Sequence, residues 1–101
     1  MTVTAGELKS LTPNVCKATR LLKLLASEQR LMILCKLFEG EASVSKLADY
    51  LGQSVPATSQ HLAKMRAEEL VETRREGQTI HYSISDPAAK RIVDTLCEIY
   101  K

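Results

Sequence analysis

The segment SVSKLADYLGQSVPATSQHLAKMR, residues 43–66, decides the fold of this chain. Its first half predicts a helix of about two turns, capped by Ser43 and ended by Gly52. Its second half predicts a longer helix over 54–69, with Ser54 as its cap. Two helices joined by such a tight turn have the proportions of a helix-turn-helix. The function of that unit depends on the side chains that its second helix presents to solvent.

The polar and basic side chains of the second helix favour a DNA-binding function. The chain has no acidic residue between Tyr50 and Ala67, so the predicted second helix is free of carboxylates until Glu68 and Glu69 at its far end. A DNA major groove accepts hydrogen-bonding and cationic side chains, and the amide dipoles at a helix N-terminus favour phosphate. A solvated polar helix face is the simpler alternative. As DNA contacts we predict Ser54, Ala57, Thr58, Ser59, Gln60, His61 and Lys64.

A change of hydrophobic period follows this helix. Ile80, Tyr82 and Ile84 alternate with polar residues, and a glycine-containing turn precedes them, which predicts a β-hairpin. A hairpin directly after a reading helix is a wing, whose tip can reach a backbone phosphate or a narrow minor groove. The alternative is an ordinary solvent-exposed turn in which the arginines only reduce aggregation. At the wing we predict DNA contacts from Arg74, Arg75, Gln78 and Thr79.

Three further helices flank this core. Thr12 and Pro13 predict the start of the first helix, with Thr12 as its cap. Another helix, predicted over 28–38, carries an apolar stripe that includes Cys35 and Phe38. The last helix begins at Asp86–Pro87 and runs to the C-terminus. Residues 1–11 show no period and are expected to be a flexible N-terminus. The domain is therefore predicted to span residues 12–101.

The composition excludes several classes of protein. The chain has 101 residues, 45% of them apolar and 26% charged, which fits one small globular domain. We find no stretch apolar enough to cross a membrane and no signal-peptide pattern, so we expect a cytoplasmic protein. We also expect no enzyme, because a glycine-rich phosphate loop and a nucleophile with a placed base are both missing. Three cysteines without a CxxC or CxC motif argue against a disulfide framework or a zinc knuckle.

Five segments together resemble the ArsR/SmtB family of bacterial transcriptional repressors. The most specific is SQHLAKMR (59–66), and the others are ASEQRLMIL (26–34), LADYLG (47–52), LV (70–71) and REGQTIHY (75–82). The resemblance covers about residues 18–100 and implies a mostly α-helical winged helix-turn-helix with a β-hairpin wing. It also implies a homodimer formed through the first and last helices. Two-fold symmetry then implies an inverted-repeat operator in double-stranded DNA, with half-sites about one helical turn apart.

Repressors of this family release DNA when an inducer binds, and the known metal sites are poorly represented here. The arsenic and cadmium type has cysteines in the first helix of the helix-turn-helix, where this chain has none. The zinc type takes histidines from the last helix, and this chain has only Asp86, Asp94 and Glu98 there. The chain is therefore not expected to require a metal cofactor.

The cysteines remain as candidate sensors. Cys35 resembles the first sensing thiol of the thiol- and sulfide-responsive (SqrR/BigR-like) branch, in which the second lies near the end of the last helix. Here Lys101 occupies that position, and Cys97 lies one turn earlier on the same stripe. Cys35 and Cys97 are thus predicted to respond to persulfide, sulfide or an oxidant. Alternatively, Cys16, Cys35 and Cys97 bind arsenite or another soft metal ion, since such ions favour thiolates, or all three thiols are inert packing residues and the inducer is different.

The sequence therefore predicts a DNA-binding repressor that is released by thiol modification. A protein-interaction module built on the same fold is a rival reading, because a fold does not determine a function. A regulator that displaces another DNA-bound factor, rather than repressing directly, is a further alternative.

Overall fold

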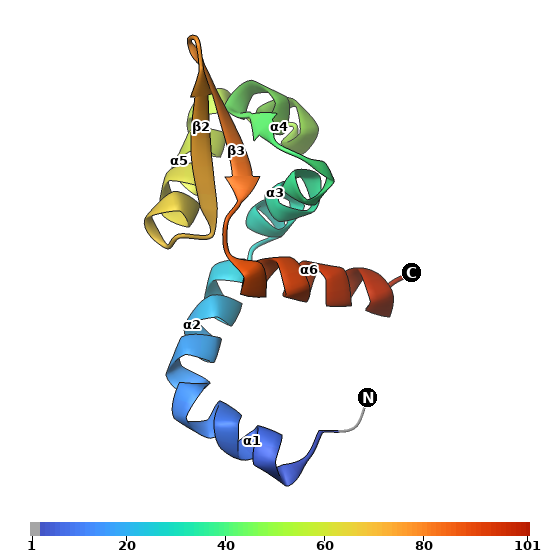
Figure 1. Ribbon diagram of the computed structural model, residues 1–101. Helices are drawn as coiled ribbons and strands as arrows, with labels where there is room; N and C mark the ends of the chain where they lie inside the picture. The colour runs from blue at the N-terminus through green and yellow to red at the C-terminus, as the bar shows by residue number, and fades with distance from the viewer. Residues whose placement is uncertain (1–2) are drawn as a thin grey trace.

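The computed structural model describes residues 3–101 and has six α-helices, one short 3-10 helix and a small sheet in that range. Figure 1 shows the wing hairpin at one end of the molecule and the N-terminal helices at the other. The fold is a winged helix-turn-helix, as predicted. Its elements are α1 (Ala5–Leu11), η1 (Thr12–Asn14), α2 (Val15–Leu25), α3 (Glu28–Glu39), β1 (Ala42–Ser43), α4 (Val44–Leu51), α5 (Val55–Ala67), β2 (Val71–Glu76), β3 (Thr79–Ile84) and α6 (Pro87–Ile99).

Side-chain caps set the helix starts that the sequence predicted. Ser43 accepts a hydrogen bond from the backbone N–H of Lys46 at 3.3 Å, and Ser54 accepts one from Ala57 at 3.2 Å. Each cap satisfies an amide that the first turn leaves without a partner. Gly52 ends α4 with a φ of 67°, a left-handed conformation that glycine adopts without strain. The chain can therefore turn sharply from α4 into α5.

The N-terminal segment differs from the prediction. Residues 5–11 form helix α1, where no regular structure was expected, and Thr4 rather than Thr12 is the side-chain cap. The hydroxyl of Thr12 instead donates to the carbonyl of Leu8 at 3.0 Å, so it belongs to a continuing helical turn. The expected helix start at Thr12 is wrong. Residues 1 and 2 of the expected flexible segment lie outside the described residues.

The sheet has one strand more than the sequence predicted. Its order is β1-β3-β2, with both pairs antiparallel. The hairpin register pairs Arg74 with His81, and on the other side of β3 the two-residue strand β1 pairs Ser43 with the same His81. A strand of two residues carries no alternation, so sequence periodicity could not reveal β1. It ties the end of α3 to the base of the wing.

The hydrophobic core lies where α3, α4, α5, the sheet and α6 meet. Its fully buried side chains include Ile33, Leu34, Leu47, Leu62, Met65, Leu70 and Val93. The buried stripe of α3 therefore runs through Ile33, Leu34 and Leu37, whereas Cys35 and Phe38 of the predicted apolar stripe are exposed in the single chain. Both lie to one side of that stripe, since each residue of a helix is rotated by about 100° from the last. Cys35 is left accessible as a result.

A second apolar surface remains exposed in the single chain. On α1 and α2 it comprises Leu8, Leu11, Val15 and Leu22, and at the end of α6 it comprises Ile99 and Tyr100. Leu22 and Tyr100 keep 58% and 82% of their surface exposed. Figure 1 shows α1 and α2 extending away from the core, with α6 on the same side of the molecule. Within residues 3–101, no helix has both the length and the apolar character needed to span a bilayer.

Candidate nucleic-acid interface and thiol pocket

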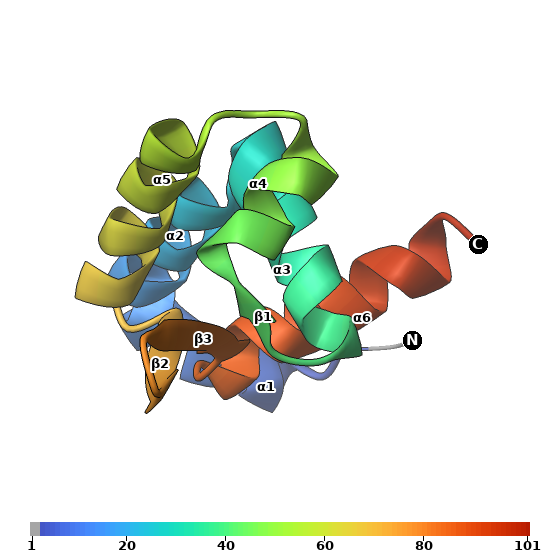
Figure 2. The ribbon, with the colours of Figure 1, turned by 90° about the horizontal axis from the view of Figure 1, so that it is seen from above.

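Helix α5 presents a polar, acid-free face beside the wing. Ser54, Gln60 and Lys64 are exposed, whereas Ala57, Ser59 and His61 are half-buried. The hairpin β2–β3 lies beside α5 in both views of the ribbon (Figures 1 and 2). The helix and the hairpin can thus approach one ligand from the same side. A DNA duplex fits this arrangement, with α5 in the major groove and the wing on the backbone.

Thr58, one of the predicted DNA contacts, is buried in the structure and faces away from any ligand. It is 0% exposed, and its hydroxyl donates to the carbonyl of Ser54 at 2.9 Å, inside the first turn of α5. Its side chain therefore packs into the core and satisfies its own donor locally. The sequence grouped it with its polar neighbours because residue type alone does not show which way a threonine faces.

The wing tip is a tight turn that leaves one arginine without an acidic partner. Gly77 takes a φ of 62°, and Arg75 donates from Nε to the carbonyl of Gly77 at 3.0 Å. Gln78 and Thr79 are exposed at the same tip. Among the described residues no carboxylate forms an ion pair with Arg75, so its charge remains available to a phosphate.

Arg74 has a different environment from Arg75. Its Nη2 lies 2.5 Å from Oε1 of Glu41, its Nε 3.2 Å from the same oxygen, and its Nη1 3.1 Å from Oε2 of Glu76. The hydrogen bond from Arg74 holds the pKa of Glu41 below its usual range, and the two carboxylates raise the pKa of Arg74. Glu41 was not among the predicted residues, because no local pattern in a sequence links residues 33 positions apart.

Cys35 and Cys97 line one pocket between α3 and α6. The pocket has a volume of about 540 Å³, and its other walls are the side chains of Leu31, Val93, Leu96 and Tyr100. Burial against this apolar lining, and then the proximity of Cys97, raise the pKa of the Cys35 thiol. The structure thus brings together the two thiols that the sequence proposed as a sensing pair. Both residues are accessible, so a small reagent can reach them.

Cys16 lies elsewhere in the protomer. It is exposed on α2 and lines a separate pocket with Arg20, Lys23, Arg30 and Glu68. In the part of the chain that the structure describes, no cluster of three cysteine, histidine or acidic residues is arranged to hold a metal ion. Within one protomer, the three cysteines therefore do not form the single site that the metalloid alternative requires.

Comparisons with known proteins agree with this geometry. Residues 27–73 match the family described as bacterial regulatory protein, arsR family. The transcriptional activator HlyU of Vibrio cholerae is 43% identical over 93 residues, which cover 92% of this chain and 86% of HlyU. The arsenical resistance operon repressor of Escherichia coli is 43% identical over 79 residues, covering 74% of this chain and 68% of the repressor. Both relatives are regulators of transcription by name.

Solved structures show the same architecture. The transcriptional repressor BigR of Xylella fastidiosa matches with a TM-score of 0.82 and 34% identity, covering 98% of each chain. A homodimeric winged helix-turn-helix DNA-binding domain of Mycobacterium bovis matches with a TM-score of 0.75 and 28% identity, covering 99% of this chain and 90% of that domain. Sequence, fold and the polar face of α5 agree, and this chain belongs to the ArsR family of winged helix-turn-helix, DNA-binding transcriptional regulators.

Proposed function

We propose that this protein is a homodimeric, cytoplasmic repressor that releases its operator when the thiols of Cys35 and Cys97 are modified. In this proposal α5 enters the major groove of an inverted repeat, and the wing contacts the flanking backbone. The remaining candidate contacts are Ser54, Ala57, Ser59, Gln60, His61, Lys64, Arg75, Gln78 and Thr79.

The shared pocket of Cys35 and Cys97 is the observation that carries the sensing part of the proposal. The two cysteines come from α3 and α6, which are far apart in sequence, and they face one apolar cavity. A bond between their sulfurs would change how α6 packs on α3. The proposed dimer interface includes α6, so this change would alter the spacing of the two α5 helices and lower operator affinity.

A persulfide is the oxidant that balances the formation of a bond between the two cysteine sulfurs. One thiolate attacks the outer sulfur of a persulfide RSSH, releases the thiol RSH and becomes a persulfide itself. The second thiolate then attacks the cysteine-bound sulfur of that group, which forms the disulfide and releases H₂S. The two cysteines lose two electrons and the persulfide gains them. Each further RSSH inserts one sulfur into the bridge and releases one more RSH.

The test is the intact mass of the purified protein after exposure to a persulfide or to arsenite, measured beside DNA release. The DNA is an operator selected from random duplexes by the reduced protein. We expect the persulfide to link Cys35 to Cys97, to leave Cys16 open to alkylation and to release the DNA. Cys35→Ser and Cys97→Ser each prevent the link and the release, and Cys16→Ser is the matched control that prevents neither.

A metalloid sensor is the second candidate, favoured by the similarity to the arsenical resistance operon repressor. Its site requires Cys16 to meet Cys35 and Cys97 across the dimer, because one protomer keeps them in separate pockets. Arsenic retained with all three thiols protected from alkylation would establish this function and reject the dithiol mechanism. If neither reagent changes the mass or the DNA affinity, the thiols are packing residues.

A further inference from the structure

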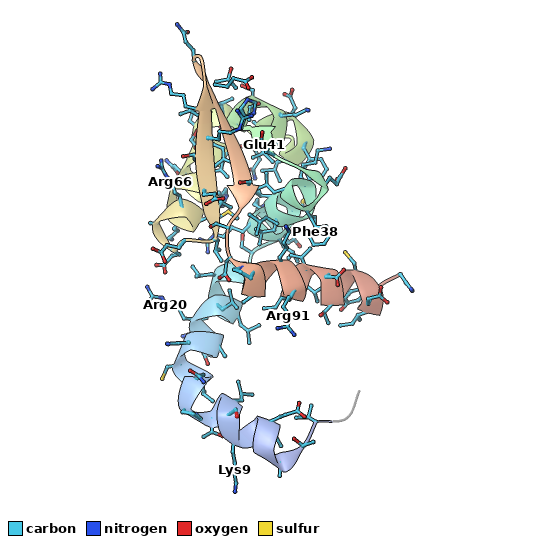
Figure 3. The ribbon with its side chains drawn as sticks, viewed as in Figure 1. Lys9, Arg20, Phe38, Glu41, Arg66 and Arg91 are labelled. Atoms are coloured by element: carbon cyan, nitrogen blue, oxygen red, sulfur yellow. The ribbon has the colours of Figure 1, made fainter. Side chains whose placement is uncertain are left out.

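The ion pair between Arg74 and Glu41 spans the small sheet from one outer strand to the other. Arg74 is on β2, and Glu41 immediately precedes β1. The middle strand β3 lies between them, with His81 opposite Arg74 in the register. Figure 3 shows Glu41 beside the hairpin. The contact therefore connects the wing to the segment that leaves α3.

The guanidinium of Arg74 uses its donors on carboxylates from two directions. Glu41 accepts from Nε and Nη2, and Glu76 accepts from Nη1. The two carboxylates outweigh the single positive charge of Arg74. The imidazole of His81 also lies nearby, with its Nε2 3.9 Å from Oε1 of Glu76. A phosphate that approached Arg74 would meet two negative groups.

Arg75 contrasts with its neighbour. Successive residues of a strand point to opposite faces, so the two arginines leave the hairpin on different sides. Among the described residues the side chain of Arg75 bonds only to the carbonyl of Gly77, and no carboxylate pairs with it. The wing thus has one arginine committed to the protein and one open to a ligand.

We propose that Arg74 is a positioning residue rather than a phosphate contact: its ion pair with Glu41 fixes the wing relative to the segment that connects α3 to the helix-turn-helix, and Arg75 makes the phosphate contact at the tip. This inference rests on the proposed DNA-binding function. A wing held at a fixed angle delivers Arg75 and Gln78 to the backbone with less loss of entropy on binding.

The test measures operator affinity against salt concentration for Arg74→Gln, Glu41→Gln, the double variant and Arg75→Gln. A lost phosphate contact lowers the slope of log K against log salt by about one. We expect that reduction for Arg75→Gln. Arg74→Gln and Glu41→Gln should each weaken binding by about two- to fivefold, the range of an exposed ion pair, with the slope unchanged. The double variant should be no weaker than the weaker single variant, because both remove the same contact.

The sign of the Glu41→Gln effect separates positioning from general electrostatics. Removal of a negative charge near DNA strengthens binding if only long-range attraction matters, whereas loss of the wing's anchor weakens it. Glu76→Gln is the matched control: it removes the same charge but leaves the Glu41 contact, so affinity should stay constant or rise. Arg74→Lys keeps the charge and loses the planar fork, and it should weaken binding without a change in slope.

Two results would overturn the inference. One is tighter binding by Glu41→Gln, and the other is a slope lowered by about one in Arg74→Gln, which marks a phosphate contact. Thermal unfolding of each variant checks that it is folded before its affinity is compared. If the unmodified protein selects no DNA sequence, it is the proposed function that fails, and this outcome is distinct from both.

Discussion

The thiol of Cys35 combines an accessible position with an environment that disfavours its charged form. Burial in the pocket and the proximity of Cys97 both raise its pKa, so a smaller fraction is thiolate at neutral pH than for an ordinary cysteine. Because the folded-state pKa is raised, the contribution of this thiol to the stability of the fold is fully present below the unfolded-state pKa. This contribution to stability is lost as the pH rises through the folded-state pKa.

We expect Cys97→Ser to lower the pH at which Cys35 is half-maximally alkylated. The substitution removes the charge interaction with Cys97 and leaves the larger contribution from burial, so the midpoint moves toward the ordinary value without reaching it. The measurement is the rate of iodoacetamide labelling at Cys35 against pH, read by peptide mass. Cys16→Ser serves as control, and a midpoint that moves only in that variant would contradict the assignment of the pocket.

Gln60 is the polar residue of α5 that we expect to contribute most to base recognition. It is exposed, and an amide can make a bidentate contact with adenine. Gln60→Ala should weaken operator binding by about 1–3 kcal/mol and leave dimerisation unchanged. Thr58→Val is the control: its side chain is buried, so operator affinity should remain within about twofold. Titration of labelled operator DNA measures both, and a larger loss for Thr58→Val would argue against the orientation of α5.

At the scale of elements, the turn between α4 and α5 determines where the reading helix points. Gly52 has a left-handed φ of 67°, and an added Cβ would meet no atom within 4 Å. Gly52→Ala should therefore destabilise the fold by about 1–2 kcal/mol through backbone strain alone. Gly6→Ala is the matched control, since Gly6 is in helix α1 with only one ordinary contact, to Thr4. It should not destabilise the protein, and urea unfolding of the two variants tests the difference.

Two exposed ion pairs connect elements that are distant in sequence. Arg20 of α2 lies 2.8 Å from Glu68, which ends α5, and Arg74 of β2 contacts Glu41 after α3. Exposed pairs of this kind add little stability, usually below about 1 kcal/mol. Their consequence is geometric. The pair of Arg20 and Glu68 connects α2 to the end of α5, and the pair of Arg74 and Glu41 connects the wing to the segment after α3.

At the scale of the whole molecule, α1 and α2 leave large apolar side chains exposed in the single chain. These residues are spaced at helical intervals, and Leu22 alone is 58% exposed. Exposed apolar side chains at helical spacing are typical of an interaction surface, and a second copy of this chain is the partner that the proposed function requires. The exposed end of α6, at Ile99 and Tyr100, extends the same requirement to the last helix.

Leu22→Glu should shift the protein toward monomer. A carboxylate at this position would be buried without a partner in the dimer, which costs several kcal/mol. Sedimentation velocity at a series of concentrations measures the shift, and operator affinity should fall with it because two half-sites are no longer bound together. Ser45→Glu adds the same charge at an exposed position on α4 and should leave the dimer intact. An unchanged dimer in Leu22→Glu would remove α2 from the proposed interface.

Much of the architecture was predictable because local chemistry sets it. Caps such as Ser43, Ser54 and Asp86, and the glycines at 52 and 77, act on their own neighbours in the chain. Helix α1 escaped prediction because its exposed apolar residues gave no clear stripe, and β1 escaped because two residues carry no period. The helix starts set by Ser43 and Ser54 and the position of the hairpin, in contrast, follow from the sequence alone, although α5 ends at Ala67 rather than at the predicted residue 69.

The sequence by itself determined the helix-turn-helix, the wing, the acid-free face of α5 and the candidate thiols. Only the tertiary structure decided which of these residues are available: it buries Thr58, pairs Arg74 with Glu41, and brings Cys35 and Cys97 into one pocket apart from Cys16. The physical reason is the distance along the chain over which each kind of interaction acts. Helix caps, turns and periodicity act over a few residues, whereas burial, ion pairing and thiol proximity depend on how distant helices and strands pack.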